Sequence, residues 1–333
     1  MESSSRGNFN ILLKVILAIF LLVFLILLFV SSFIKKAESK VKSQDGMVNV
    51  LILGKSGAGH AGGDLTDTMI LASISLGERS ANLTSIPRDI WIPEIRAKIN
   101  SAYYWGKEKS EFGGGIPFAK KNVEAIVGLP INYALVLDFS SFKEIIDALG
   151  GVRIDVANSF SDSLYPIEGR EEDLCGGEEE TSASRKELKC RYETVHFEKG
   201  VNYMDGTTVL KYVRSRNGDN NENTDLAREA RQQRVISAIK SKMLSSSILL
   251  NPIKLLKVWK VVRSSVETDM DFSSMLILGK EMLVIDGNIR SSVVPEGMLT
   301  SPPKSQKYDY QYVFIPQKGD WSELQSWIKD LIK

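Results

Sequence analysis

Residues 48–53 read VNVLIL, and residues 54–63 continue as GKSGAGHAGG. The first stretch is almost continuously apolar, which is typical of a β-strand that is buried on both faces of a sheet. It runs directly into a glycine-rich loop. A buried strand followed by such a loop indicates an α/β sheet, so this stretch decides the fold class.

The segments that follow extend the sheet. Residues 68–74 (TMILASI) and 81–86 (ANLTSI) are predicted to form a β-hairpin. Further along, the hydrophobic spacing predicts helices over 117–127 and 140–149, and strands over 133–138 and 152–156. This alternation predicts an α/β fold in which helices sandwich a central mixed β-sheet.

The regular pattern stops at residues 161–193. Between Glu168 and Cys190 eight acidic residues outnumber four basic ones, so we interpret this region as an acidic surface insertion. Beyond it, residues 201–213 are predicted to contain a helix. Further helices are predicted over 226–244, 253–264, 273–284 and 320–332, and strands over 288–294 and 311–315. Nothing in the tail resembles a linker, so residues 47–333 are predicted to form one domain.

The most apolar part of the chain is residues 15–33, VILAIFLLVFLILLFVSSF, nineteen residues without a charge. Such a run is long enough to cross a bilayer as a helix. We predict a transmembrane helix there, a cytoplasmic N-terminus at 1–14 and a lysine-rich stalk at 34–46. A cleaved secretory signal is the alternative, but its apolar region spans only about 7–15 residues and ends at a small-residue cleavage site.

Two features of the sequence disagree about the side of the membrane on which the domain lies. Two basic residues, Arg6 and Lys14, precede the apolar run, whereas four lysines lie between 35 and 42, and this excess alone predicts a cytoplasmic domain. The only two cysteines, Cys175 and Cys190, both lie in the acidic insertion. A disulfide between them would favour an oxidising, extracytoplasmic compartment.

The overall charge is balanced, because 42 Lys and Arg residues stand against 41 Asp and Glu residues. Such a balance gives no field that would favour nucleic acid as a partner. Function must therefore depend on local charge clusters. Four segments carry them: LTDT at 65–68, IPRD at 86–89, YVRSR at 212–216 and REARQ at 228–232.

The arginines of the last two segments are spaced to share faces. Arg214 and Arg216 are two residues apart, so an extended chain would direct both side chains the same way. Arg228, Arg231 and Gln232 fall on one face of a helix near its N-terminus, where the helix dipole adds positive potential. Guanidinium groups bind phosphate oxygens in pairs, so we expect a diphosphate ligand. Solvated surface charges are the alternative for any one of them.

In this order, the motifs resemble those of the LytR-CpsA-Psr family of bacterial cell-wall glycopolymer ligases. The resemblance covers VNVLILG, LTDTMIL, SIPRDIW, KINSAY at 98–103, DALGGVRIDV at 147–156, YVRSR and AREARQQ at 227–233, and continues weakly through VETDMDFSSML at 266–276. It implies a single-pass cell-membrane anchor with an extracytoplasmic catalytic domain, and it outweighs the lysine count. It also implies a phosphotransferase reaction, in which a glycan on a polyprenyl pyrophosphate is transferred to a peptidoglycan hydroxyl.

The resemblance further implies roles for individual residues. The expected pyrophosphate ligands are Arg88, Lys98, Arg214, Arg216, Arg228 and Gln232, with Arg231 in support. Asp67, Arg88 and Asp225 are the expected catalytic residues. Asp67 would bind Mg²⁺ or orient the acceptor hydroxyl, with Asp64 as a second metal ligand. The chain departs from the family pattern at Gly54-Lys55-Ser56, where the family commonly has Gly-x-Asp, and at Leu65, where it commonly has Arg.

Other functions are less well supported. The Gly-Lys-Ser of the first loop lacks the spacing of a phosphate-binding P-loop, and the two histidines, His60 and His196, are too far apart in sequence to indicate a shared site. A phosphatase acting on lipid pyrophosphates, with water replacing the sugar hydroxyl, remains an alternative within the enzymes. A non-catalytic, membrane-bound regulatory or binding protein is the alternative outside them.

Overall fold

The computed structural model describes residues 41–332 apart from 59, 61, 171–172, 174, 176–188 and 286–288, and apart from the side chains of 225, 226, 229 and 296. The predicted transmembrane run and most of the stalk lie outside these residues. Within the described part of the chain, no helix has both the length and the apolar character needed to span a bilayer.

A six-stranded mixed sheet forms the centre of the fold, in the order β11-β6-β1-β2-β3-β12. Its strands are β1 (Met47–Lys55), β2 (Thr68–Ser75), β3 (Ser80–Ser85), β6 (Tyr133–Asp138), β11 (Glu267–Thr268) and β12 (Ile289–Val293). β1 pairs antiparallel with β2 and parallel with β6, and β2 pairs antiparallel with β3. The predicted mixed sheet and its hairpin are therefore confirmed.

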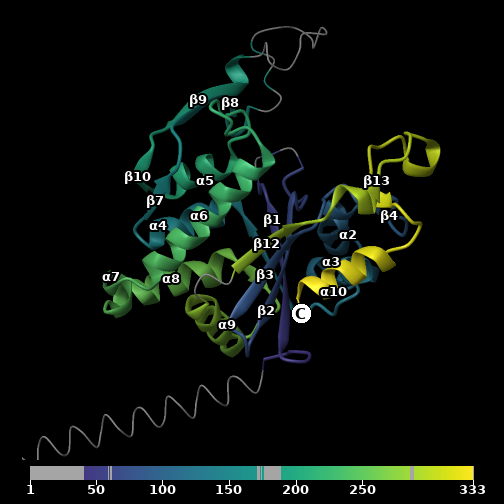
Figure 1. Cartoon of the computed structure of the whole chain (residues 1–333), viewed down its shortest axis with the longest axis horizontal. Helices are drawn as coiled ribbons and strands as arrows, with labels where there is room; N and C mark the ends of the chain where they lie inside the picture. Colours follow the sequence, from purple (N-terminus) through teal and green to yellow (C-terminus); the bar gives the residue numbers. More distant parts are fainter. Residues whose placement is uncertain are drawn as a thin grey trace, which may run out of the picture.

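Strand β1 supplies side chains to a core on each face of the sheet. Leu51 and Leu53 are fully buried against helices α2 (Ala102–Glu108), α3 (Gly115–Val127) and α10 (Ser322–Leu331). Val48 and Val50 pack on the opposite face against helix α9 (Phe272–Val284). Figure 1 shows the sheet between these two layers. Burial on both faces explains why the strand sequence is almost continuously apolar.

A second lobe has its own hydrophobic core, formed by residues such as Ile154, Phe160 and Val209. It contains the two-stranded sheets β7–β10 and β8–β9 and the helices α4, α5 and α6. The bounds are α4 (Phe139–Ala148), β7 (Val152–Val156), β8 (Phe160–Pro166), β9 (Tyr192–Phe197), β10 (Gly200–Met204), α5 (Gly206–Arg214) and α6 (Asp225–Met243). Helices α7 (Ser246–Leu249) and α8 (Pro252–Ser265) lie beside α4 (Figure 1).

Several expected boundaries change. The helix expected within residues 201–213 is α5, with Asp205 as its N-cap, and strand β10 occupies the first part of that stretch. The insertion begins as strand β8 and returns as β9, so its base is regular. The strand expected over 311–315 is reduced to β14 (Ile315–Pro316), which pairs with β13 (Leu299–Thr300). The short pair β4 (Trp91–Ile92) and β5 (Ala97–Lys98) completes the strands.

Candidate functional site

The sheet brings the ends of several motifs to one edge. Gly54, near the end of β1, lies opposite Thr68, the first residue of β2. Lys55 lies opposite Asp138, the last residue of β6. Strand β3 ends beside the beginning of β2. The residues that precede β2 and the residues that follow β1 and β3 therefore meet, although they come from separate motifs.

Asp67 and Arg88 form an ion pair at this edge. The Arg88 Nη1 lies 2.9 Å from Oδ1 of Asp67, and the Asn100 side-chain amide donates to the same oxygen at 3.1 Å. The neighbouring Thr66 is fully buried, and its backbone N–H and hydroxyl both donate to the Asn100 carbonyl, which fixes the loop. Among the described residues nothing donates to Oδ2 of Asp67, and the side chain is 48% exposed. One oxygen of this carboxylate therefore remains available to a ligand.

Asp89 connects two of the expected ligand-binding cations. Its Oδ1 lies 2.5 Å from the Lys98 ammonium, and its Oδ2 lies 3.6 Å from Nε of Arg88. Both cationic side chains remain partly exposed, so this pairing orients them without removing them from solvent. Lys98 ends β5, and the short hairpin β4–β5 thus carries it to the same edge.

Arg214 and Arg216 do not lie on an extended segment, and that expectation is wrong. Arg214 is the last residue of α5, and the chain leaves the helix at Ser215, whose φ and ψ are −55° and 129°. The Arg214 guanidinium lies over the Phe139 ring, 4.0 Å from its centroid, and Nη1 lies 3.5 Å from the Tyr165 hydroxyl. Aromatic contacts of this kind hold a guanidinium flat while leaving its outer N–H groups available.

Arg216 lies among three other arginines. Desolvation lowers the pKa of Arg216, and the positive charges of Arg228, Arg88 and Arg214 lower it further. Only Asp67 opposes this effect among its main electrostatic neighbours. The main electrostatic neighbours of this guanidinium thus come from four sequence motifs, and three of these four neighbours are positive. Such a cluster suits a phosphate or diphosphate, because each guanidinium fork binds two anionic oxygens.

The loop that carries these arginines is fixed from beneath by Asp162. This carboxylate is 1% exposed and lies on β8. Its Oδ2 accepts hydrogen bonds from the Ser215 hydroxyl at 2.6 Å, the Arg216 N–H at 3.0 Å and the Asn217 N–H at 3.1 Å. Three donors on one oxygen define the path of the chain directly after helix α5.

Arg231 does not share the expected anion-binding face, because its side chain is completely buried. It donates to the Ser215 carbonyl at 2.6 Å, and it forms an ion pair of 2.7 Å with Glu222, whose carbonyl it also contacts at 2.8 Å. The direct role expected from helical spacing is corrected to an internal one. Arg231 holds the loop that follows α5, at Ser215, against α6.

The remaining predicted residues of α6 lie near its first turns. Thr224 is the N-cap, and its hydroxyl accepts a hydrogen bond from the Ala227 N–H at 3.1 Å. Arg228 is partly buried and Gln232 is exposed. Asp225 is the first residue of the helix, and its side chain lies outside the described part of the structure.

The glycine-rich loop closes on itself. Gly57 donates its N–H to the Gly63 carbonyl at 2.9 Å, and a Cβ on Gly63 would lie 2.2 Å from the Gly57 carbonyl oxygen. Close backbone approach therefore accounts for Gly63, and a left-handed φ of +91° accounts for Gly57. The loop also carries Lys55, whose ammonium lies 2.6 Å from Oδ1 of Asp64 and 5.5 Å from the centroid of the Tyr103 ring. The Lys55 hydrogen bond lowers the pKa of Asp64.

The carboxylates fit Mg²⁺ only as a site that needs further ligands. Asp67 and Asp64 are each about half exposed, at 48% and 46%, and each has one carboxylate oxygen paired with a protein cation. Among the described residues, the one cluster of at least three potential His, Cys, Asp or Glu ligands is Asp173, Cys175 and Cys190, far along the chain in the insertion. Mg²⁺ commonly takes one or two carboxylates and completes its shell with phosphate oxygens and water.

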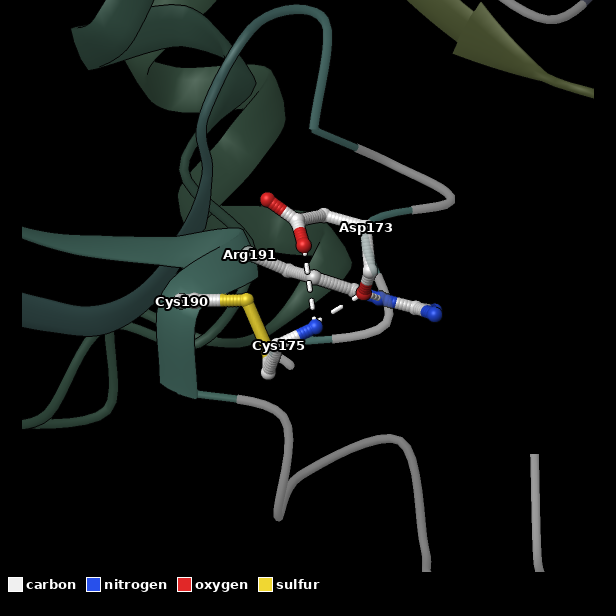
Figure 2. The surroundings of a disulfide bond; sticks show 4 residues. All are labelled: Asp173, Cys175, Cys190 and Arg191. Atoms are coloured by element: carbon white, nitrogen blue, oxygen red, sulfur yellow. Dashed lines mark hydrogen bonds between the residues drawn. A yellow bond between two sulfur atoms is a disulfide. The ribbon is translucent and has the colours of Figure 1, made fainter. Parts of the chain in front are cut away.

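That cluster in the insertion is a disulfide rather than a metal site. Cys175 and Cys190 are bonded, with their Cα atoms 5.6 Å apart, as the sequence predicts. Figure 2 shows Asp173 beside the bond, where its Oδ1 accepts the Cys175 N–H at 2.9 Å and its carbonyl accepts from the mostly buried Arg191. The disulfide closes the outer end of the β8–β9 hairpin.

Sequence reasoning missed three polar residues of the site. Asn100 and Asp89 lie within the motifs KINSAY and SIPRDIW, in which only Lys98 and Arg88 carry an expected role. Asp162 lies in the region interpreted as irregular, and only the pairing of β8 with β9 reveals its buried position.

Comparison with known proteins identifies relatives of this chain. The model of the LytR_cpsA_psr family matches residues 31–329. The polyisoprenyl-teichoic acid–peptidoglycan teichoic acid transferase TagT of Bacillus subtilis is 30% identical over 183 residues, which cover 54% of this chain and 47% of TagT. TagU of Bacillus cereus, which carries the same transferase description, is 28% identical over 243 residues, covering 71% of this chain and 66% of TagU. The chain thus spans about half to two thirds of the length of these relatives.

Solved structures share the fold. Bacillus subtilis TagV superposes with a TM-score of 0.57 at 21% identity, covering 87% of this chain and 98% of TagV. The Lin1025 protein of Listeria innocua gives a TM-score of 0.55 at 24% identity, covering 86% of this chain and 98% of that chain. Because the family model spans nearly the whole sequence and includes every described strand and helix of the site, this chain belongs to the LytR_cpsA_psr family.

Proposed function

We propose that this protein transfers a glycosyl-phosphate unit from a polyprenyl-pyrophosphate carrier to a hydroxyl of peptidoglycan or another cell-wall acceptor. The observation that carries the proposal is the ion pair of 2.9 Å between Asp67 and Arg88, together with the charges of Arg88, Arg214 and Arg228 that lower the pKa of Arg216. The transferase descriptions of TagT and TagU support the same reaction class. Those descriptions concern the relatives, whose lengths this chain covers only in part.

The donor diphosphate would bind the arginine cluster. Arg88, Arg214, Arg216 and Arg228 offer guanidinium forks, and Lys98 and Gln232 offer further donors. Before binding, Arg216 is close to like charges that disfavour its protonated form. A diphosphate would neutralise this repulsion, so positioning and charge neutralisation would both follow from binding, as phosphoryl transfer requires.

The acceptor hydroxyl would then attack the phosphorus nearest the sugar. The bond from this phosphorus to the bridging oxygen breaks, and polyprenyl phosphate leaves. Asp67 would orient the attacking hydroxyl through Oδ2 and accept its proton as the new P–O bond forms, and its ion pair with Arg88 holds the carboxylate in place. Asp225 is a second candidate carboxylate for this role. The cations that bound the diphosphate stabilise the charge that builds on the leaving phosphate.

Mg²⁺ is part of the proposal. As the alternative to orienting the acceptor hydroxyl, Asp67 would hold Mg²⁺ through Oδ2, with Asp64 from the same loop, and the donor phosphates would supply the remaining anionic ligands. Bound there, it would add positive charge against the phosphate oxygens. Lys55 already pairs with Asp64, so metal binding would compete with that ion pair.

The proposed location is the outer face of the cell membrane. Residues 15–33 would form the transmembrane helix, with residues 1–14 in the cytoplasm and residues 34–46 as the stalk. The disulfide between Cys175 and Cys190 supports an oxidising compartment for the domain. Membrane, carrier lipid and peptidoglycan are thus the proposed partners.

A transfer assay on the full-length protein in vesicles tests the proposal. A polyprenyl-pyrophosphate glycan is supplied with a peptidoglycan oligomer, and both the joined product and polyprenyl phosphate are measured. We expect both to form, and Arg216→Ala to abolish them. Arg290→Ala is the matched control. This exposed arginine lies on β12 opposite Asn82 of β3, away from the end of β3 that borders the site.

The alternatives give different results in the same assay. Free glycan phosphate without joined product would indicate the lipid pyrophosphatase. Tight donor binding with neither product, in the presence of Mg²⁺ and acceptor, would indicate the non-catalytic binding or regulatory protein. Either result overturns the transferase assignment.

A further inference from the structure

The chain from Arg231 to Val266 contains no acidic residue. The same stretch contains eight basic residues, Arg231, Arg234, Lys240, Lys242, Lys254, Lys257, Lys260 and Arg263. Elsewhere the charges must balance this excess, because the whole chain has 42 basic and 41 acidic residues. The structure turns part of this stretch, α7 and α8, into one surface of the second lobe.

Large apolar side chains are exposed on that surface. Ile248 and Val258 are buried and hold α7 and α8 against the fold. Leu250, Ile253 and Leu256 point away from it and are 80%, 78% and 67% exposed. Figure 1 shows α7 and the beginning of α8 at an outer end of the lobe. We define the α7–α8 surface by Leu249, Leu250, Ile253, Leu256, Lys254, Lys257, Lys260 and Arg263.

The cations of the α7–α8 surface are not neutralised. Lys254, Lys257 and Lys260 are exposed, and no acidic side chain of the described residues forms an ion pair with them or with Arg263. Exposed leucine and isoleucine interleaved with unpaired lysine is the composition of a segment that lies in the interface of an anionic bilayer.

We propose that the α7–α8 surface rests on the anionic phospholipid headgroups of the membrane that anchors the chain. The apolar side chains would enter the boundary between headgroups and acyl chains, and the lysines would contact lipid phosphates. The inference rests on the proposed anchor at 15–33. The 13-residue stalk reaches at most about 45 Å when fully extended, so the domain stays near the bilayer. In Figure 1 the beginning of β1, α7 and α9 all lie toward the same lower side of the molecule.

An environment-sensitive fluorophore on the full-length protein in vesicles tests this contact. The native cysteines form a disulfide, so a cysteine introduced by Leu250→Cys is labelled selectively without reductant. Gln317→Cys, at an exposed position after β14, is the control. In phosphatidylglycerol vesicles we expect the label at 250 to shift to shorter wavelength and to be quenched by acyl-chain quenchers several-fold more strongly than the label at 317.

Charge variants distinguish this contact from the anchor. Replacing Lys254, Lys257 and Lys260 by Gln should return the label at 250 to its behaviour in neutral phosphatidylcholine vesicles. The same protein should still float with the vesicles, because the anchor is intact. Gln at Lys199, Lys304 and Lys307, which are exposed and form no ion pair among the described residues, is the matched control and should change nothing. Transfer activity, measured separately, reports on the proposed function.

Three outcomes overturn the inference. The labels at 250 and 317 could be equally accessible to water in phosphatidylglycerol vesicles. The substitution of Lys254, Lys257 and Lys260 could leave the quenching unchanged. The label at 250 could respond only when a soluble phosphodiester polymer is added to neutral vesicles, which would assign the surface to an anionic wall polymer.

Discussion

The buried carboxylate of Asp162 accepts the Ser215 hydroxyl at 2.6 Å and thereby sets the direction in which Arg214 and Arg216 leave helix α5. The carboxylate belongs to β8, at the base of the insertion hairpin, whereas the arginines face the edge of the central sheet. The two lobes therefore cooperate in the site. The second lobe determines the position of two arginines, and the first lobe provides Asp67 and Arg88.

Asp162→Asn should weaken both the fold and donor binding. The amide retains the size of the side chain but loses the charge that three donors share, and such charge-assisted bonds contribute about 1.5–3 kcal/mol. We expect the free energy of unfolding to fall by about this amount and donor affinity to fall with it. Denaturant unfolding and donor titration measure the two effects.

Asp155→Asn is the matched control, because Asp155 is exposed on β7. It should leave unfolding and donor affinity unchanged. An Asp162→Asn protein with wild-type donor affinity would show that the Arg216 position does not depend on this carboxylate.

Arg231→Met should be strongly destabilising. Arg231 and Glu222 are buried, with 0% and 8% of their side chains exposed, and the substitution leaves the carboxylate without its partner. Removing one member of a buried ion pair costs about 3–5 kcal/mol. Thermal or denaturant unfolding should show this loss, and a second substitution, Glu222→Gln, should restore part of it. A loss no greater than that of an exposed arginine such as Arg290 would contradict the internal role.

Many of the helices and strands could be predicted from periodicity. The strand over 133–138 and the helices over 253–264 and 273–284 agree with β6, α8 and α9 to within a residue. These segments are long or strongly patterned, and local apolar spacing determines them. The strand at 152–156 was also predicted, but its partner was not. It pairs with β10 outside the central sheet, because pairing depends on tertiary contacts that one segment does not encode.

The sequence motifs predict most of the cationic residues of the candidate site but not their arrangement. Helical spacing placed Arg228, Arg231 and Gln232 on one face, yet Arg231 turns inward to Glu222 and Ser215. Whether Arg231 faces solvent or the interior depends on the loop between α5 and α6, to which it bonds. The sequence of that loop is polar and carries no periodicity. The burial of Asp162 could not be predicted from the sequence either, because a carboxylate in a polar, acidic stretch is typically solvated.

Reducing the disulfide should loosen the insertion without affecting the arginine site. Replacing Cys175 and Cys190 by Ser removes a closed loop of sequence separation 15, which the chain-entropy account rates at about 3 kcal/mol. We expect faster proteolysis between β8 and β9 and unchanged donor affinity. Mass spectrometry without reductant provides the direct check. Two free thiols in protein from its native membrane would contradict the bond and weaken the extracytoplasmic assignment.

The Lys55–Asp64 ion pair should contribute to stability only above acidic pH. Its hydrogen bond lowers the pKa of Asp64 below the ordinary 3.8, so the folded state favours the charged carboxylate. The contribution is complete above the ordinary value and is lost as the pH falls through the lower folded value. Wild-type protein should therefore be more stable than Asp64→Asn at neutral pH. The difference should disappear in strong acid, and a constant difference across pH would exclude the ion pair as its source.

Magnesium should bind together with the donor rather than before it. Asp67 has one oxygen engaged by Arg88 and Asn100, and Asp64 has one engaged by Lys55, so the free protein offers few unpaired ligands. A bound diphosphate would add oxygens and also neutralise the surrounding arginines. Titration calorimetry of the full-length protein should show weak Mg²⁺ binding that strengthens when a polyprenyl pyrophosphate is present. Ser56→Asp should raise the affinity of the donor-free protein by adding a carboxylate beside Lys55, and Asp67→Asn should reduce it. Equal Mg²⁺ affinity with and without donor, or Asp67→Asn with unchanged metal binding, would remove Asp67 as the metal ligand and leave it only the role of orienting the acceptor hydroxyl.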